Sequence, residues 1–569
     1  RGGMIARVWA PGAASMELER DGKREPMVQA PGGWWRAAAE LPHGADYRFC
    51  PEGGPPLPDP RSRWQPNGVH GASRSFDPDR FAWTDAGWHP PAWASAIVYE
   101  LHVGTFTPEG TFDAAITRLD HLVGLGISHV EIMPVAEFSG ERGWGYDGVA
   151  LFAPHHAYGG PEGFQRLINA CHARGLAVLL DVVYNHLGPS GNYLASFGPY
   201  FTGRYATPWG EALNFDGPES DGVRAFFLAN ARYWLCDFHL DGLRLDAVHA
   251  IADTSARPFL EDLARAVRRW EAETGRAMVL VAESDANDPR LSAPPLAGGC
   301  GLDAQWDEDF HHALHAVLTG ERTGYFSDFG SLGALAATLR RGFYLDGRYS
   351  VFRRRRHGRP FRGSDGARLV MYAQNHDQVG NRAKGERLSR MVSPGRLRIA
   401  AVLTLLSPGV PLLFQGEEWG AATPFFYFTD HAEPELAAAV RQGRPAGSPD
   451  PQDRVTFARS RLLWHEQDDD LLLWYRALIR LRRTTSLAAH DLDEVRVRHN
   501  DRAGWLVLAR GPWRIACNFA ATRQPVPLGA SPSGWRLVLA SAAGVALAED
   551  AATLPPDSAA IFAPGQRES

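Results

Sequence analysis

The stretch DGLRLDAVHAI, residues 241–251, predicts a buried strand that ends in charged side chains. Arg244 and Asp246 alternate with leucines and lie two residues apart, so both project to the same face of a strand. Burying such a pair costs free energy, so its presence needs an explanation. The pair is either a structural ion pair or part of a functional site. A charged strand end that leads into a helix is typical of a β/α barrel, where chemistry lies at the C-terminal ends of the strands.

Seven further strand-like runs accompany this stretch. In chain order the eight runs are IVYELHV, HVEIMPV, LAVLLDVVYNH, the central stretch, AMVLVAE, GLDAQW, RLVMYAQ and VPLLF. Helical patterns separate them: residues 112–123 predict one helix ended by Gly124 and Gly126, and the helix after the central stretch is expected to begin near Asp253 or Ser255. Strand alternating with helix eight times predicts an α/β protein with a (β/α)8 TIM barrel.

The barrel is expected to be flanked by two β-sandwiches. Residues 1–88 contain short extended runs between Pro/Gly-rich turns and predict an N-terminal sandwich, of the kind found in carbohydrate-binding domains. Residues 89–485 are assigned to the barrel and its loop excursions, and residues 486–569 return to strand-like alternation in a C-terminal sandwich. Trp34 and Trp35 are attributed to the first sandwich's core and barrel interface rather than to glucan binding.

Composition limits the partners and the compartment. The net charge of −6 argues against a nucleic-acid partner, and the run Arg353 to Arg356 is expected to be a solvated loop face. Five scattered cysteines without a CxxC pair predict reduced thiols and a cytoplasmic protein. We expect no membrane partner, because no apolar run is long enough to span a bilayer and no signal-peptide apolar region is evident. Since the chain opens at Arg1 with Met4 close behind, a trimmed leader remains open.

Polar residues close several of the predicted barrel strands. They are Asp181, Asn185 and His186 on the third strand, Arg244 and Asp246 on the fourth, Glu283 on the fifth, and Asn375, His376 and Asp377 on the seventh. Because parallel strand ends meet at one mouth of a barrel, these groups predict an active site there.

The chemistry that this set favours is glycoside hydrolysis, which needs one ionised and one protonated carboxyl group. Asp246 beside Arg244 suits the ionised role, and Glu283 at the end of an apolar strand suits the protonated one, because desolvation raises a carboxyl pKa. Asp377 is expected to bind sugar hydroxyls while the ring distorts, with neutral His186 and His376 as donors.

Metal binding is the alternative chemistry. Asp181, His186 and Asp246 offer ligand atoms, but no HxxxH or HxH spacing supplies a compact ligand set near the strand ends. We therefore expect no metal and no cofactor. The adjacent pairs His155–His156 and His311–His312 are expected to point apart, as loop or subsite residues.

Four segments carry a family resemblance. DVVYNH (181–186), GLRLDAVH (242–249), VAES (281–284) and QNHDQ (374–378) resemble the ordered signatures of the α-amylase superfamily of glycoside hydrolases. The resemblance implies that Asp246 is the nucleophile, that Glu283 is the general acid/base, and that Asp377 stabilises the transition state. It further implies that the reacting sugar is surrounded by Tyr146, His186, Arg244 and His376.

The sequences around these signatures also resemble the trehalose-releasing hydrolases of that superfamily. The resemblance implies cleavage, with retention, of the α-1,4 bond next to the terminal trehalose of maltooligosyltrehalose, so maltooligosaccharides would be the other partners. It implies further substrate contacts at His249, Asp309, His311, Gln378 and Asn381. Retention predicts carboxyl groups of Asp246 and Glu283 about 5 to 5.5 Å apart.

Three alternatives share the fold. A glycogen or starch branching enzyme would pass the glycosyl unit to a sugar hydroxyl, and a debranching hydrolase would cleave α-1,6 bonds. A non-catalytic carbohydrate-binding protein normally lacks one of the three carboxylates, all of which are present here.

Overall fold

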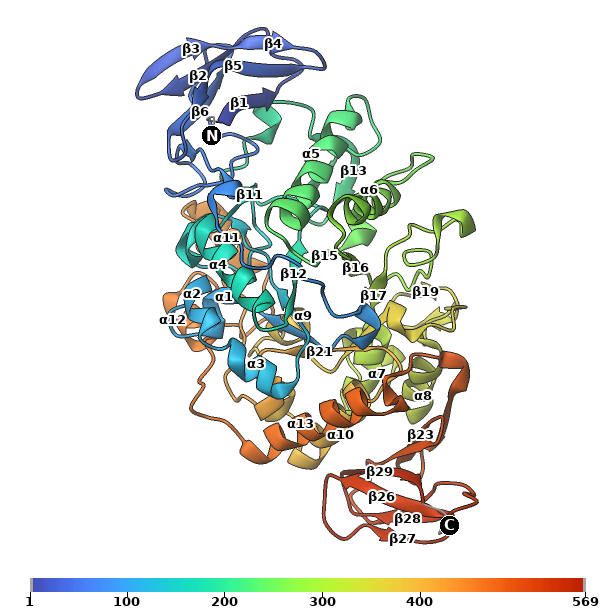
Figure 1. Cartoon of the computed structure of the whole chain (residues 1–569). Coiled ribbons are helices and arrows are strands. Elements are labelled where there is room, and N and C mark those ends of the chain that lie inside the picture. The colour runs from blue at the N-terminus through green and yellow to red at the C-terminus, as the bar shows by residue number, and fades with distance from the viewer. Residues whose placement is uncertain (1–3, 566–569) are drawn as a thin grey trace.

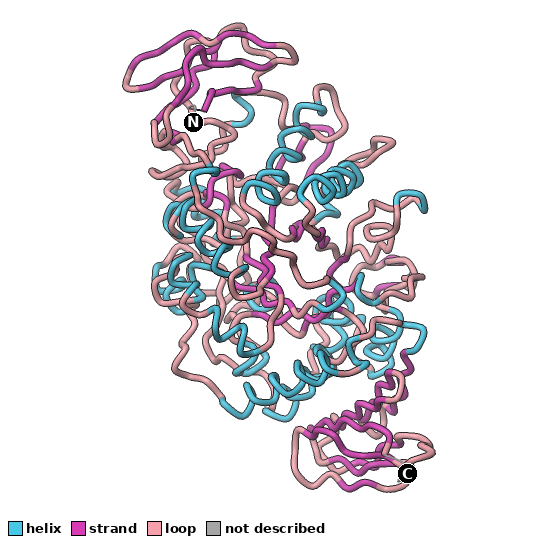
Figure 2. The backbone as a smooth tube through the Cα atoms, in the orientation of Figure 1, coloured by secondary structure: helices cyan, strands magenta, loops and turns pink. Residues whose placement is uncertain are grey.

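A closed barrel of eight parallel strands forms the centre of the molecule, as the sequence predicts. The structure is a computed structural model that describes residues 4–565. The barrel strands are β8 (Val98–Leu101), β9 (His129–Ile132), β12 (Ala177–Val182), β15 (Gly242–Leu245), β16 (Val279–Ala282), β17 (Ala304–Trp306), β20 (Leu369–Tyr372) and β21 (Val410–Phe414). In Figure 2 they line the middle of the tube trace, inside a ring of helices. The predicted fold class is confirmed.

Helices pack around the barrel and bury their apolar faces against its strands. They are α2 (Phe112–Ile116), α3 (Leu119–Leu125), α4 (Gly160–His172), α5 (Ser220–Arg232), α6 (Phe259–Thr274), α7 (Glu308–Thr319), α8 (Leu332–Arg341), α10 (Pro394–Leu405) and α13 (Asp469–Thr484). The single helix predicted over residues 112–123 is wrong, because α2 and α3 are separate. Gly126 caps α3 at φ 100°, and a Cβ there would lie 2.7 Å from Ile479 Cγ2.

Shorter helices lie in the loops: α1 (Val103–Phe106), α9 (His376–Gly380), α11 (Pro434–Gln442) and α12 (Arg454–Arg459). The loops also contain two-stranded ribbons: β10 (Ala136–Glu137) with β11 (Ala150–Pro154), β13 (Phe201–Thr207) with β14 (Gly210–Leu213), and β18 (Tyr349–Ser350) with β19 (Arg355–Arg356). No helix among residues 4–565 is long and apolar enough to cross a membrane.

Antiparallel sheets lie at both ends of the molecule (Figure 1). The N-terminal strands are β1 (Met4–Trp9), β2 (Met16–Arg20), β3 (Lys23–Pro26), β4 (Val28–Ala30), β5 (Trp34–Leu41), β6 (Asp46–Pro51) and β7 (Ser73–Arg74), in the orders β1-β5-β4 and β3-β2-β6-β7. Trp35 is buried and donates to the Ala10 carbonyl at 3.2 Å, whereas Trp9 packs edge-on against Tyr200 of the barrel domain at 5.4 Å. These contacts fix the N-terminal sheets on the barrel.

The C-terminal strands form two further sheets, β22-β23-β24-β29-β26 and β25-β28-β27. Their bounds are β22 (Val495–Asn500), β23 (Trp505–Arg510), β24 (Trp513–Asn518), β25 (Gln524–Pro527), β26 (Trp535–Ala540), β27 (Ala546–Leu547), β28 (Ala551–Leu554) and β29 (Ser558–Pro564). Arg510 joins them to the barrel by donating to the carbonyls of Leu406 and Ser407 at 3.0 and 2.8 Å. The domain boundaries at residues 88 and 485 stay predictions.

Candidate active site

A single buried guanidinium, that of Arg244, connects the carboxylates at the strand ends. Strand register places Arg244 beside Asp181 of β12. Its Nη1 donates to both Asp181 oxygens at 2.9 and 2.8 Å and to Asp246 Oδ1 at 2.7 Å, while Nη2 lies 3.9 Å from Glu283 Oε2. The guanidinium also lies 4.3 Å above the Trp306 ring, and its side chain is only 2% exposed. A charge this deeply buried is stabilised by its acidic partners.

Asp246 is held from two sides directly after β15. Arg244 binds its Oδ1, and the amide of Asn185 donates to its Oδ2 at 2.8 Å and to its main-chain carbonyl at 2.8 Å. These donors fix the carboxylate's orientation, and its side chain remains 12% exposed to the barrel mouth. Asn185 follows the third barrel strand and Asp246 follows the fourth, so this contact brings two of the predicted strand ends together.

Glu283 follows β16 and faces Asp246 across the mouth. The main-chain N–H of Ala247 donates to its Oε2 at 2.6 Å, and Ala247 itself has a left-handed φ of 40°. A non-glycine residue in this region stores about 1 to 3 kcal/mol of strain, which is common at functional sites. Burial raises the pKa of Glu283 well above its ordinary value, against the opposing effect of Arg244, in the direction that the sequence predicts.

Tyr146 and His376 complete the floor of the site. The Tyr146 hydroxyl donates to Asp181 Oδ2 at 2.6 Å and lies 2.8 Å from His376 Nε2, with the two rings stacked. Burial raises the pKa of Asp181 to about 6, although Arg244 opposes the shift.

Asp377 lies in the first turn of α9 and is exposed. Asn381 donates to its Oδ1 at 2.5 Å, and Gln378 donates to Glu308 Oε2 at 2.7 Å. Glu308 was not among the predicted site residues. Burial raises its pKa to about 7, and the charge of Asp377 adds to the shift. The sequence signal was its place at the start of the helix after the sixth strand.

Two predicted histidines differ in burial: His186 is buried and His249 is exposed. His186 stacks on the exposed ring of Trp209 at 4.6 Å and 12°, and burial lowers its pKa. The exposed His249 lies near Asp285, two residues after Glu283, and a hydrogen bond from Arg353 lowers the pKa of Asp285.

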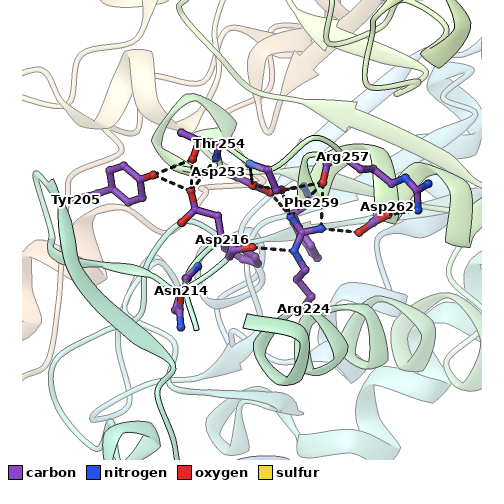
Figure 3. A network of polar contacts seen from close by, with 12 residues as sticks. Tyr205, Asn214, Asp216, Arg224, Asp253, Thr254, Arg257, Phe259 and Asp262 are labelled. Atoms are coloured by element: carbon purple, nitrogen blue, oxygen red, sulfur yellow. Dashed lines mark hydrogen bonds and ion pairs between the residues drawn. The ribbon is translucent and has the colours of Figure 1, made fainter. Parts of the chain in front are cut away.

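A polar network centred on Arg224 holds the segment that follows His249 (Figure 3). Arg224, on α5, donates to Asp253 and Asp262 at 2.5 Å each and to the Phe215 carbonyl at 2.8 Å. The Asp253 carboxylate accepts the main-chain N–H of Phe259 at 2.6 Å. The predicted helix start near Asp253 or Ser255 is therefore wrong: α6 begins at Phe259, and Asp253 binds its first turn from outside.

Asp309 and His311 are turned into the protein. Asp309 accepts the main-chain N–H of Leu345 at 2.6 Å, and His311 Nδ1 lies 2.9 Å from the carbonyl of Ala373. Both side chains are buried by these contacts. Their roles as sugar contacts stay predictions.

One group of described residues has the spacing to hold a metal ion: Glu137, His155 and His156. It lies on β10 and after β11 and includes no residue of the strand-end set. The expectation that His155 and His156 point apart is wrong, because both face Glu137, at 3.2 and 2.6 Å. Glu137 also accepts the main-chain N–H of His156 at 2.8 Å, so these contacts bind the loop together.

Comparison with known proteins agrees with this arrangement. Residues 76–198 match the family model "Alpha amylase, catalytic domain", and residues 490–561 match a domain of unknown function, DUF3459. Malto-oligosyltrehalose trehalohydrolase from Arthrobacter ramosus is 51% identical, covering 94% of this chain and 95% of the relative. The enzyme of that name from Rhizobium sp. is 49% identical, covering 98% and 97%. A solved putative α-amylase from Salmonella typhimurium superposes with a TM-score of 0.90 at 38% identity, covering 98% and 97%.

The barrel, its strand-end carboxylates and these matches define a glycoside hydrolase of the α-amylase class. Within that class, the chain belongs to the malto-oligosyltrehalose trehalohydrolase family. The family resemblance and the enzyme class predicted from the sequence are confirmed.

Proposed function

We propose that this chain hydrolyses the α-1,4-glucosidic bond next to the terminal trehalose of maltooligosyltrehalose and releases trehalose. The observation that carries the proposal is the contact of one buried guanidinium, Arg244, with Asp181, Asp246 and Glu283. It sets an oriented aspartate beside a glutamic acid whose pKa is raised by burial, and retaining hydrolysis requires one ionised and one protonated carboxyl group. The trehalose specificity is supported by the family to which the chain belongs.

The proposed reaction has two steps. Asp246 attacks the anomeric carbon while Glu283 gives its proton to the departing trehalose oxygen, so a covalent glycosyl-enzyme forms. Glu283, now ionised, then takes a proton from water, and the hydroxide oxygen bonds to the anomeric carbon as the Asp246 ester bond breaks. The predicted carboxyl separation of about 5 to 5.5 Å belongs to this retaining route.

The surrounding groups have supporting roles in this proposal. Asp377, exposed at the mouth, would bind sugar hydroxyls as the ring distorts, together with Gln378 and Asn381. Tyr146 and His376 would face the reacting sugar, and His186 and His249 would contact it from the rim.

The proposed setting is the cytoplasm, with maltooligosyltrehalose and maltooligosaccharides as small-molecule partners. All five cysteines are free, which suits a reducing compartment. In the arginine run, Arg353 is bound to Asp285 at 2.8 Å, and Arg354 to Arg356 are exposed.

Product analysis tests the proposal. Maltotriosyltrehalose and, as a control, maltopentaose are incubated with the full chain and the products are resolved by chromatography. Trehalose plus maltotriose, with maltopentaose cut far more slowly, is the expected result. Longer or branched products would indicate a branching transferase, cleavage confined to α-1,6 bonds would indicate a debranching enzyme, and binding without turnover would indicate a carbohydrate-binding protein.

A further inference from the structure

A buried carboxylate outside the signature segments, Glu100, holds one face of His376. Glu100 lies on β8 and is 0% exposed. Its Oε2 accepts the main-chain N–H of His376 at 2.9 Å, and its Oε1 is hydrogen-bonded to the ring Nδ1. An imidazole nitrogen is ordinarily more basic than a carboxylate oxygen, so the shared proton lies on Nδ1. Glu100 therefore fixes both the ring's orientation and one of its protons.

The opposite ring nitrogen also carries a proton. His376 Nε2 lies 2.8 Å from the Tyr146 hydroxyl, which has a single hydrogen. That hydrogen is used at Asp181 Oδ2, 2.6 Å away, because both Asp181 oxygens accept from Arg244 and the group acts as an ionised acceptor. The Tyr146 oxygen must then accept from His376 Nε2. With both nitrogens donating, His376 is an imidazolium.

We propose that Glu100 is a positioning residue for the hydrolysis: it keeps His376 doubly protonated and aimed, so that a charged donor holds the Tyr146 hydroxyl and a positive charge lies beside the carboxylates of the mouth. This inference rests on the proposed function. A charge-assisted hydrogen bond is roughly twice as strong as a neutral one, so the imidazolium holds the Tyr146 hydroxyl in place more firmly than a neutral histidine would. The ring's charge also offsets part of the negative charge that Asp181, Asp246 and Asp377 bring to the mouth.

The groups around His376 favour this protonation state on balance. The titratable and charged groups that face it are Glu100 on β8, Tyr146 on the loop between β10 and β11, Asp181 on β12, Arg244 on β15, Asp377 on its own helix, and His102 before α1. Burial opposes the charge of His376 most strongly. The effect of Glu100 is the largest of those that favour the charge, and together they raise the pKa of His376. Arg244 opposes the charge from the other side.

Glu131 provides a matched control. It lies on β9 directly opposite Glu100 in the barrel register and is likewise buried, at 1% exposure. Burial raises its pKa well above the ordinary value, with the charge of Glu100 adding to the shift. Its Oε1 has no hydrogen-bond partner among the described residues. Glu131→Gln thus makes the same exchange at an equally buried position on the neighbouring strand, whereas Glu100→Gln acts at the hydrogen-bond partner of His376.

The decisive measurement is the protonation of His376 in the full chain labelled with 15N-histidine, its NMR signals assigned by their loss in His376→Gln. We expect both ring nitrogens of the parent enzyme to be protonated at neutral pH. In Glu100→Gln the loss of one proton should move to lower pH by about one unit or more, and Glu100→Asp should recover part of the shift. The alkaline limb of kcat/KM on maltotriosyltrehalose should move by the same amount. Glu131→Gln should move neither quantity.

Several outcomes would overturn the inference. A neutral His376 in the parent enzyme would overturn it. Because this measurement does not depend on activity, a failure of the proposed function is distinguished from a failure of this inference. A Glu100→Gln enzyme that is folded by circular dichroism and loses rate equally at all pH values would show only a structural role. Equal shifts in Glu100→Gln and Glu131→Gln would show that interior charge in general, and not the contact to His376, controls the ring.

Discussion

Replacing Arg244 by methionine should destabilise the protein by an amount that depends on pH. Methionine keeps much of the side chain's length but removes the charge that binds Asp181 and Asp246 at 2.7 to 2.9 Å in a 2% exposed position. Removing one partner of a buried ion pair costs about 3 to 5 kcal/mol. A typical domain has a free energy of unfolding of about 5 to 15 kcal/mol, so at neutral pH the substitution should remove a large share of it.

The sign of the pH effect follows from the raised pKa of Asp181, about 6 in the folded protein, where burial outweighs Arg244. A carboxyl group whose pKa is raised on folding stabilises the protein below its unfolded pKa of about 3.9, and this contribution is lost as the pH rises through the folded value. Without Arg244 the Asp181 and Glu283 pKa values rise further, because Arg244 lowers both. The stability loss in Arg244→Met should therefore be largest at pH 7 and shrink toward pH 4.

The assay is urea unfolding of parent and variant at pH 4, 5, 6 and 7, followed by tryptophan fluorescence. Arg482→Met is the control, because Arg482 is also buried but donates to the carbonyls of Leu405, Ser407 and Gly409, at 2.7 to 2.8 Å. Its loss should cost stability without a matching dependence over this pH range. An equal cost of Arg244→Met at pH 4 and pH 7 would refute the electrostatic reasoning and assign the effect to packing.

Three further substitutions test the proposed roles. Asp246→Ala should lower kcat on maltotriosyltrehalose by several orders of magnitude and leave the circular dichroism spectrum unchanged; near-parental turnover would remove Asp246 from the nucleophile's role. Glu283→Gln should lower kcat on maltotriosyltrehalose by about 10²- to 10⁴-fold, the range of general acid catalysis. The loss of kcat on α-maltosyl fluoride should be far smaller, because its leaving group needs no proton. Equal losses on both substrates would count against Glu283 as the general acid. Arg224→Met should lower the free energy of unfolding by about 1.5 to 3 kcal/mol, because charged hydrogen bonds to Asp253 and Asp262 are lost. It should also raise KM more than it changes kcat, because the segment after His249 is no longer held in place. An unchanged KM would show that this network does not affect substrate binding.

The barrel and much of its mouth could be predicted because they leave repeating signals in the sequence. Each buried parallel strand is a short apolar run, and the polar residues that end it stand out against that run, as Arg244 and Asp246 do. Details set by tertiary contacts leave no such signal. The start of α6 depends on Asp253 reaching Phe259 across a loop, and the facing of His155 and His156 depends on Glu137 from another strand.

Glu100 and Glu131 lie close together because of strand register, which the sequence pattern does not reveal. Each glutamate stands within an apolar run, VYEL or HVEI, where a single charge carries no periodic signal. Only the closed barrel sets them side by side on β8 and β9, and sets Asp181 beside Arg244 on the next two strands, β12 and β15. Four neighbouring strands thus carry a connected layer of buried charge. Because an unpaired buried charge is costly, such a layer persists only when its members neutralise one another by pairing or by protonation. The imidazolium paired with Glu100 is one such neutralisation, and the raised pKa of Glu131 favours another, so the barrel's interior is linked to the protonation state of its mouth.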